Sequence, residues 1–176
     1  KLPEAQSMNR PVDAPEGIGF GWYEAGDPVY YAPWKCHQGK DWKAVKGSPV
    51  WFREGGVITF AGLLGELGNY VQMQSDRDAS LWWGLAHLSI IQCAVGQAVA
   101  AGEVVGLSGG VPGDYGAGLS SGQHVHEEAR VGWQWGARIN PDSIVLEEGM
   151  TDAQKAILER AIAVLDSNNQ IRALEI

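Results

Sequence analysis

The stretch NYVQMQSDRDASLWWGLAHL, residues 69–88, contains two runs of aromatic and aliphatic residues separated by Asp76-Arg77-Asp78. It lies within residues 48–108, where short β-type runs are repeatedly interrupted by glycine. Two strand-forming runs that flank a short polar segment are typical of a β-hairpin. We therefore expect an antiparallel strand pair here, with its turn near residues 76–78.

Two neighbouring segments show the same pattern and resemble each other. SPVWFREGGVITFAG, residues 48–62, predicts a hairpin that turns at Glu54-Gly55-Gly56. QAVAAGEVVGLSG, residues 97–109, predicts a shorter hairpin that turns at Ala101-Gly102. The predicted fold class is therefore mainly β, with antiparallel β-sheets and a duplicated hairpin motif forming an open groove, plus a C-terminal amphipathic helix.

The two ends of the chain differ in composition from this central part. Residues 1–34 are rich in proline and glycine, which predicts an irregular N-terminal segment packed on the domain. Residues 35–146 form the predicted core, with a long glycine-rich loop at residues 109–122. In residues 147–176, Thr151 and Gln154 have the spacing of a capping box. Apolar residues at helical spacing follow and predict the amphipathic helix: Ile157, Leu158, Ala161, Ile162 and Leu165.

Composition and charge exclude several classes of partner. The 21 acidic and 13 basic residues give a net charge of −8, which argues against nucleic acid as a partner. No apolar run approaches the roughly 20 residues of a membrane span. Because the sequence begins with Lys1 and shows no signal peptide, we expect a processed or trimmed product. Cys36 and Cys93 are too few for a disulfide scaffold, and either form one bridge or remain free thiols.

The four histidines and one aspartate carry the chemical signal. His37 and Asp41 lie four residues apart, with Gly39 between them. His124 and His126 lie two residues apart, so in a β-strand both of their rings would project from the same face. Two imidazoles and one carboxylate are a common catalytic zinc set with a fourth position left for water. His37, Asp41 and one of the downstream histidines are therefore candidate ligands. The other member of the pair and His87 remain for acid–base work.

These residues sit in longer segments that resemble one family in order and spacing. HQGKDWKAVKGSPVWFREGGVITFAG, residues 37–62, is similar to the metal-binding opening of the lysostaphin-like (LytM-type) zinc metallopeptidases, His-x-Gly-x-Asp followed by Gly-x-Pro-Val. SSGQHVHEEAR, residues 120–130, resembles the family's closing Ser-x-Gly-x-His-x-His segment. Between them lie segments similar to the family's Gly-Asn-Tyr-Val, Ala-His-Leu-Ser and Val-Gly-Gln-x-Val elements, and the resemblance extends over residues 35–146.

The resemblance implies a role for each site residue. His37, Asp41 and His126 would bind Zn²⁺, and His124 would be the general base or proton shuttle. His87 would stabilise the oxyanion or handle the proton, and the sequence leaves open which of His87 and His124 is the base. A tyrosine near His37, with Tyr31 as the candidate, would support the transition state.

The resemblance also implies a substrate, peptides of bacterial peptidoglycan, with either the cross-bridge or the stem peptide as target. We expect an extracellular, periplasmic or virion-associated protein that belongs to a larger wall hydrolase or virion protein. The chain departs from the family pattern at Trp42 after the aspartate, at Glu127 after the second histidine of the pair, and at Leu85-Ala86 before His87. Glu127 should point away from the metal.

Two other functions remain open at this point. A catalytically inactive relative would bind and activate a cell-wall amidase, although such relatives lack some of the ligands that this chain retains. A phosphocarrier would use a histidine pair without needing Asp41. Four tryptophans either pack in the core or form an aromatic platform for a glycan or peptide: Trp82, Trp83, Trp133 and Trp135.

Overall fold

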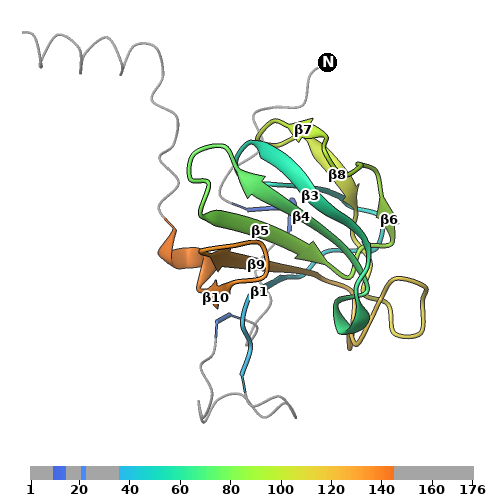
Figure 1. Cartoon of the computed structure of the whole chain (residues 1–176). Helices are drawn as coiled ribbons and strands as arrows, with labels where there is room; N and C mark the ends of the chain where they lie inside the picture. The colour runs from blue at the N-terminus through green and yellow to red at the C-terminus, as the bar shows by residue number, and fades with distance from the viewer. Residues whose placement is uncertain (1–9, 15–20, 23–35, 145–176) are drawn as a thin grey trace, which may run out of the picture. The chain divides into compact units, whose positions relative to one another are not determined.

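A computed structural model of the chain describes residues 10–14, 21–22 and 36–144. These residues form a large and a small antiparallel sheet, which face each other (Figure 1). In the large sheet the strand order is β1 (Lys40–Trp42), β9 (Val125–Val131), β5 (Leu81–Ala86), β4 (Asn69–Ser75), β3 (Gly56–Leu63) and β7 (Ala98–Val99), with β10 (Ala137–Ile139) also paired with β9. The small sheet has the order β2 (Pro49–Trp51), β8 (Val104–Leu107) and β6 (Ile90–Ile91). Two short 3₁₀ helices, η1 (Gly65–Leu67) and η2 (Pro141–Ser143), complete the described elements.

The mainly β, antiparallel fold class is confirmed, and so is the hairpin predicted at residues 69–88. β4 and β5 pair antiparallel, from Val71 opposite Leu85 to Gln74 opposite Trp82. The Ser75 hydroxyl accepts hydrogen bonds from the backbone N–H groups of Arg77 and Asp78 and so shapes the predicted turn. The amphipathic helix predicted within residues 147–176 and the segment around Tyr31 lie outside the described residues.

The other two predicted hairpins are wrong in their pairing. β2 and β3 belong to different sheets, and so do β7 and β8. Both predicted turns are corners at which the chain passes from one sheet to the other. The two similar segments instead pair with each other, β2 with β8 and β3 with β7. Local patterning identifies the strands but not their partners, because pairing depends on which faces are buried together.

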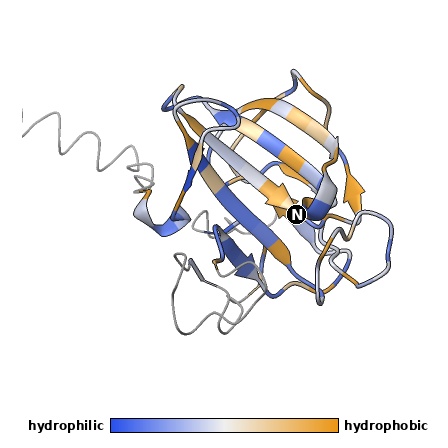
Figure 2. Cartoon of the chain, turned by 60° about the horizontal axis from the view of Figure 1, so that its bottom comes forward, coloured by the Kyte–Doolittle hydropathy of each residue, from blue (hydrophilic) through white to orange (hydrophobic). Residues whose placement is uncertain are grey.

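The core lies between the two sheets. Alternate residues of the large sheet, such as Trp83 and Leu85, point toward Val50 and Val105 of the small sheet and form one apolar cluster. Hydrophobic and hydrophilic colours alternate along only part of the sheets (Figure 2), since β9 carries consecutive hydrophilic residues. Within the described residues, no helix combines the length and the apolar character that a membrane crossing requires.

The opposite face of the large sheet carries polar residues that are also buried. Tyr70 donates a hydrogen bond from its hydroxyl to the Glu128 carboxylate at 2.6 Å, and Arg130 and Arg138 donate to the same carboxylate. Gly84 is required beneath this network, because a Cβ at that position would overlap the Tyr70 hydroxyl. Glu128 lies two residues after His126 on β9 and on the same face of the sheet. The hydrogen-bonded network therefore holds the part of the sheet next to His126 rigid.

Candidate metal centre

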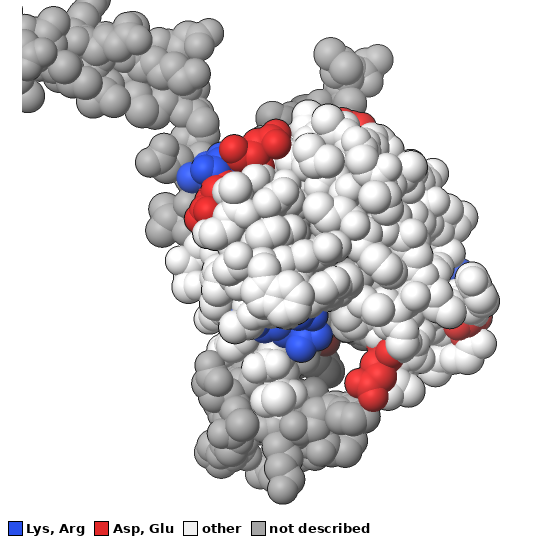
Figure 3. All heavy atoms as spheres, in the orientation of Figure 1, with Lys and Arg blue, Asp and Glu red and all other residues white. Residues whose placement is uncertain are grey.

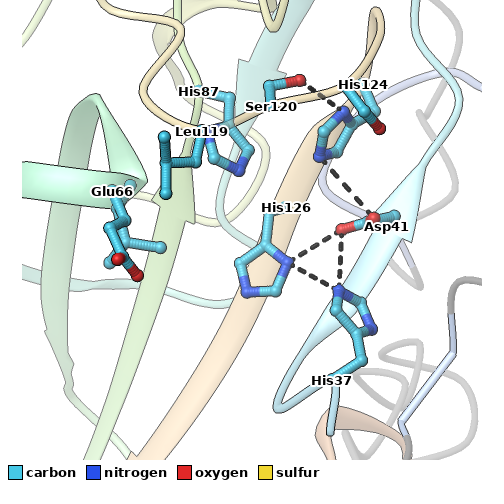
Figure 4. A pocket seen from close by; sticks show the side chains of 10 residues that line it. His37, Asp41, Glu66, His87, Leu119, Ser120, His124 and His126 are labelled. Atoms are coloured by element: carbon cyan, nitrogen blue, oxygen red, sulfur yellow. Dashed lines mark hydrogen bonds and ion pairs between the residues drawn. The ribbon is translucent and has the colours of Figure 1, made fainter. Parts of the chain in front are cut away.

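Strand register brings the candidate site residues together. β1 and β9 are adjacent and antiparallel, and their register places Asp41 directly opposite His126. On the other side of β9, His126 pairs with Ala86, so His87 follows at the end of β5. His124 precedes β9 and forms an isolated bridge with Gly109. Residues nearly ninety positions apart in the sequence thus line one site (Figure 4).

Three donor atoms from His37, Asp41 and His126 face one point. The His126 Nδ1 lies 2.8 Å from the Asp41 Oδ1, and the His37 Nε2 lies 3.2 Å from that same oxygen. The two histidine nitrogens are 3.1 Å apart. Each of the three side chains is only about a tenth exposed.

This donor set fits a tetrahedral metal ion. Ligand atoms at ~2.0–2.2 Å from zinc in tetrahedral geometry lie about 3.3–3.6 Å from one another, so a small outward shift of these donors would accommodate the ion. Burial alone would raise the pKa of Asp41, but its close contacts with His126 and His37 and the nearby ring of His124 lower it well below its usual range. Asp41 is therefore ionised, as a metal ligand must be.

Backbone carbonyls fix the tautomer of three of the four histidines. The Nδ1 atoms of His37, His87 and His124 lie 2.6, 2.8 and 2.8 Å from the carbonyl oxygens of Gly21, Ala117 and Gly122. Because a carbonyl only accepts, each Nδ1 carries the proton and each neutral ring has its lone pair on Nε2. His126 differs, since its Nδ1 faces Asp41.

His87 and His124 lie beside the donor set without belonging to it. Their ring centroids are 4.8 Å apart, and the His124 Nε2 lies 3.6 Å from the Asp41 Oδ2. Burial, reinforced by the nearby rings of His124 and His126, lowers the pKa of His87 to about 3, so its ring is neutral at neutral pH. His87 has a positive φ of 59°, a backbone conformation that is uncommon outside glycine and often marks a functional residue.

Gly39, the central residue of the His-x-Gly-x-Asp segment, has a steric role. A Cβ at this position would overlap the His126 ring and the carbonyl oxygen of Glu127. The glycine therefore allows the segment that carries His37 and Asp41 to approach β9 closely enough for the three donors to meet.

The pocket around these residues has walls that the sequence predicted only in part. It has a volume of about 190 Å³, below the roughly 300–1,000 Å³ of typical ligand pockets, and it opens at a hollow beside η1 (Figure 3). The glycine-rich loop predicted at residues 109–122 lines it through Leu119, Ser120 and Ser121. Glu66 and Leu67 of η1 also line the pocket, with Glu66 beside Leu119, and were missed. Gly65 and Gly68, which flank them, were the available sequence signal for a tight turn there.

Other features predicted for the site fall outside the pocket. Glu127 points away from the donor set, as predicted, and pairs with Arg53 in the core. The four tryptophans do not line the described pocket, and Trp83 is buried in the core with its indole N–H donated to Glu54. Cys36 and Cys93 are free thiols, and neither belongs to the described group of metal-ligating side chains.

Comparison with known proteins gives this arrangement a context. DD-carboxypeptidase/endopeptidase Mpg of Neisseria meningitidis serogroup B is 38% identical over 124 residues, which cover 70% of this chain and 26% of that protein. The chain therefore spans about a quarter of the length of this curated relative.

Two solved structures share the fold. The catalytic domain of lysostaphin, an antimicrobial peptidase of Staphylococcus simulans, superposes with a TM-score of 0.61 at 26% identity, over 80% of this chain and 96% of that domain. The catalytic domain of the prophage-encoded M23 protein EnpA of Enterococcus faecalis, in a variant form, superposes with a TM-score of 0.55 at 30% identity, over 77% of this chain and 98% of that one.

The sequence pattern of the family described as Peptidase family M23 matches residues 35–141. This range contains the donor set, both flanking histidines and the pocket walls. It covers more than half of the 176 residues, so the chain belongs to peptidase family M23.

Proposed function

We propose that the chain is a zinc-dependent endopeptidase that hydrolyses a peptide bond of bacterial peptidoglycan, in the cross-bridge or the stem peptide. The observation that carries the proposal is the convergence of His37, Asp41 and His126 on one point, with two further histidines beside it. The family match and the activity for which the Neisseria relative is named support it. Since that activity belongs to a longer protein, the substrate of this chain is part of the proposal.

In this proposal His37, Asp41 and His126 hold the metal. Zinc, when bound, supplies Lewis acidity that polarises a carbonyl and lowers the pKa of water. The Nε2 of His37 and the Nδ1 of His126 are the coordinating atoms. The Gly21 carbonyl orients the His37 ring through its other nitrogen, as outer partners do in many zinc sites.

His87 and His124 handle the protons. Each has its Nδ1–H bound to a carbonyl, so each offers an Nε2 lone pair that can take a proton from the attacking water. A ring that has gained this proton can then give it to the leaving amine. The low pKa of His87 makes its neutral ring a weak base. Because its Nδ1–H is bound to the Ala117 carbonyl, His87 can donate to an oxyanion only when its Nε2 is also protonated.

The proposal extends to location and partners. Hydrolysis of wall peptides requires the protein to act outside the cytoplasmic membrane or from a virion, with peptidoglycan as its partner. The chain is acidic, and it covers only 26% of the Neisseria relative. Both facts favour the proposal that it is the catalytic part of a larger wall hydrolase.

The test combines metal analysis with digestion of purified walls. We expect the protein to purify with about one zinc ion, to release peptide fragments from walls, to lose this activity with a chelator and to regain it with zinc. Mass spectrometry of the fragments identifies the bond. A protein that binds an amidase and stimulates it, yet releases no fragments when loaded with zinc, would instead be an activator.

A further inference from the structure

The pocket contains a second carboxylate besides that of Asp41. Among the described lining residues the acidic ones are Asp41 and Glu66, and none is a lysine or arginine. Asp41 is surrounded by the rings of His37, His124 and His126. Glu66 lies across the pocket from Asp41 (Figure 4) and is exposed, and its carboxylate makes no hydrogen bond or ion pair with any described residue.

The backbone that carries Glu66 is held in place on both sides. The Glu66 carbonyl accepts the Leu119 N–H at 2.9 Å, and the Leu67 carbonyl accepts the His87 N–H at 2.9 Å. Gly118 packs against the Glu66 carbonyl so closely that a Cβ there would overlap it. The root of the Glu66 side chain is therefore fixed relative to the glycine-rich loop and to His87, while its carboxylate faces solvent in the pocket.

We infer that Glu66 is a specificity-determining residue that selects substrates with an ammonium group close to the scissile bond. This inference rests on the proposed peptidase function. A peptide bond positioned at the donor set has its neighbouring residues beside the pocket walls. An unpaired carboxylate on such a wall attracts a cation and disfavours an anion, and the net charge of −8 adds to the attraction. The ammonium belongs either to an amino-acid side chain or to a free α-amine.

The contribution of Glu66 should be modest and sensitive to salt. We expect about a twofold to fivefold preference in kcat/KM, which corresponds to about 0.4–1 kcal/mol and lies within the range of an exposed ion pair. Raising the ionic strength to about 1 M shortens the Debye length to ~3 Å and should reduce the preference toward one.

The experiment uses wall peptides as substrates, either untreated or acetylated on their amines. The quantity compared is kcat/KM for the two forms. Synthetic versions of a cleaved peptide, acetylated only on the α-amine or only on the side-chain amine, distinguish the two sources of ammonium. We expect the zinc-loaded protein to prefer the unacetylated form by about twofold to fivefold. Glu66→Gln should bring the ratio of kcat/KM values close to one, and Glu66→Lys should invert it. Asp76→Asn removes one charge at the far end of β4, outside the pocket, and should retain the wild-type ratio.

Two results would overturn the inference: a preference that persists in Glu66→Gln, or a wild-type protein with no preference. A Glu66→Gln protein that loses more than about 100-fold in kcat on the acetylated peptide would place Glu66 in proton transfer, which also contradicts the inference. If no peptide is cleaved, the proposed function fails. Calorimetric measurement of the binding of the same peptides then tests Glu66 separately. The unacetylated peptide should have the lower Kd in the wild type, and this difference should vanish in Glu66→Gln.

Discussion

Trp42 donates its indole N–H to the carboxylate of Glu127 at 2.9 Å. These two residues follow Asp41 and His126 in the sequence, and both depart from the family pattern that the sequence resembles. Their side chains meet on the core face of the sheet, where Arg53 also pairs with Glu127. The two departures are therefore one interaction, directly behind the donor set, and they leave the donors themselves unchanged.

Removing Glu127 should destabilise the fold strongly. The side chains of Arg53 and Glu127 are 7% and 2% exposed, so Glu127→Ala leaves a buried guanidinium without its partner. We expect a loss of about 3–5 kcal/mol in the free energy of unfolding, measured by urea denaturation. The exposed pair Lys46–Asp114 is the control, and Asp114→Ala should change stability by less than about 1 kcal/mol. Equal losses in the two variants would contradict the role given to burial.

The two histidines of the His-x-His segment should separate metal binding from turnover. His126→Ala should lose zinc and activity together, because its Nδ1 lies among the donors. His124→Ala should retain zinc and lose about 100-fold or more in kcat, the usual contribution of a proton-transfer group. Zinc content by mass spectrometry and kcat on wall peptides check both. A His124→Ala protein that clears walls at the wild-type rate would refute its assigned role.

Gly39→Ala tests the close approach of the two ligand-bearing segments. The added Cβ would overlap the His126 ring, so we expect weaker zinc binding and a loss of about 1–3 kcal/mol in stability. Gly62→Ala is the matched control, because its Cβ would make ordinary contacts at 3.7 Å with Phe60. Zinc affinity measured by competition with a chelator should fall only in the Gly39 variant.

The tautomers of the four histidines are open to direct observation. Long-range ¹H–¹⁵N spectra of the zinc-loaded protein should show protonated Nδ1 atoms in His37, His87 and His124, since each faces a carbonyl oxygen. His126 should carry its proton on Nε2. An unprotonated Nδ1 in His124 would mean that its Nε2 is unable to accept a proton from water.

Acid should weaken the buried network around Glu128. Burial alone would raise its pKa, but Arg138 and Arg130 outweigh burial and lower that pKa below the ordinary value of 4.5. The folded protein therefore binds fewer protons than the unfolded chain, so this stabilisation is present above pH ~4.5 and is lost as the pH falls through the folded pKa.

Glu128→Gln is the corresponding variant. It should be less stable than the wild type at pH 7, and the difference should shrink as the pH falls below the ordinary glutamate pKa of 4.5 and then through the lowered pKa of the folded protein. Thermal denaturation from pH 7 to pH 3 measures both curves. Glu103→Gln, at an exposed position, should instead run parallel to the wild type.

The sequence by itself determined the strand-forming segments, the β4–β5 hairpin and the five candidate site residues. These features depend on local chemistry: alternation of apolar residues, a polar turn at residues 76–78, and ligand types at fixed spacing. His124 and His126 share a face because strand geometry alternates side chains, whatever the rest of the chain does.

Only the tertiary structure decided which strands pair and what surrounds the site. β2 pairs with β8 and β3 with β7 because burying their apolar faces between two sheets outweighs closing each local hairpin. The carbonyls that fix the histidine tautomers and the η1 wall with Glu66 reach the pocket from segments distant in the sequence. Their contribution arises from contacts across the fold, which spacing along the chain does not encode.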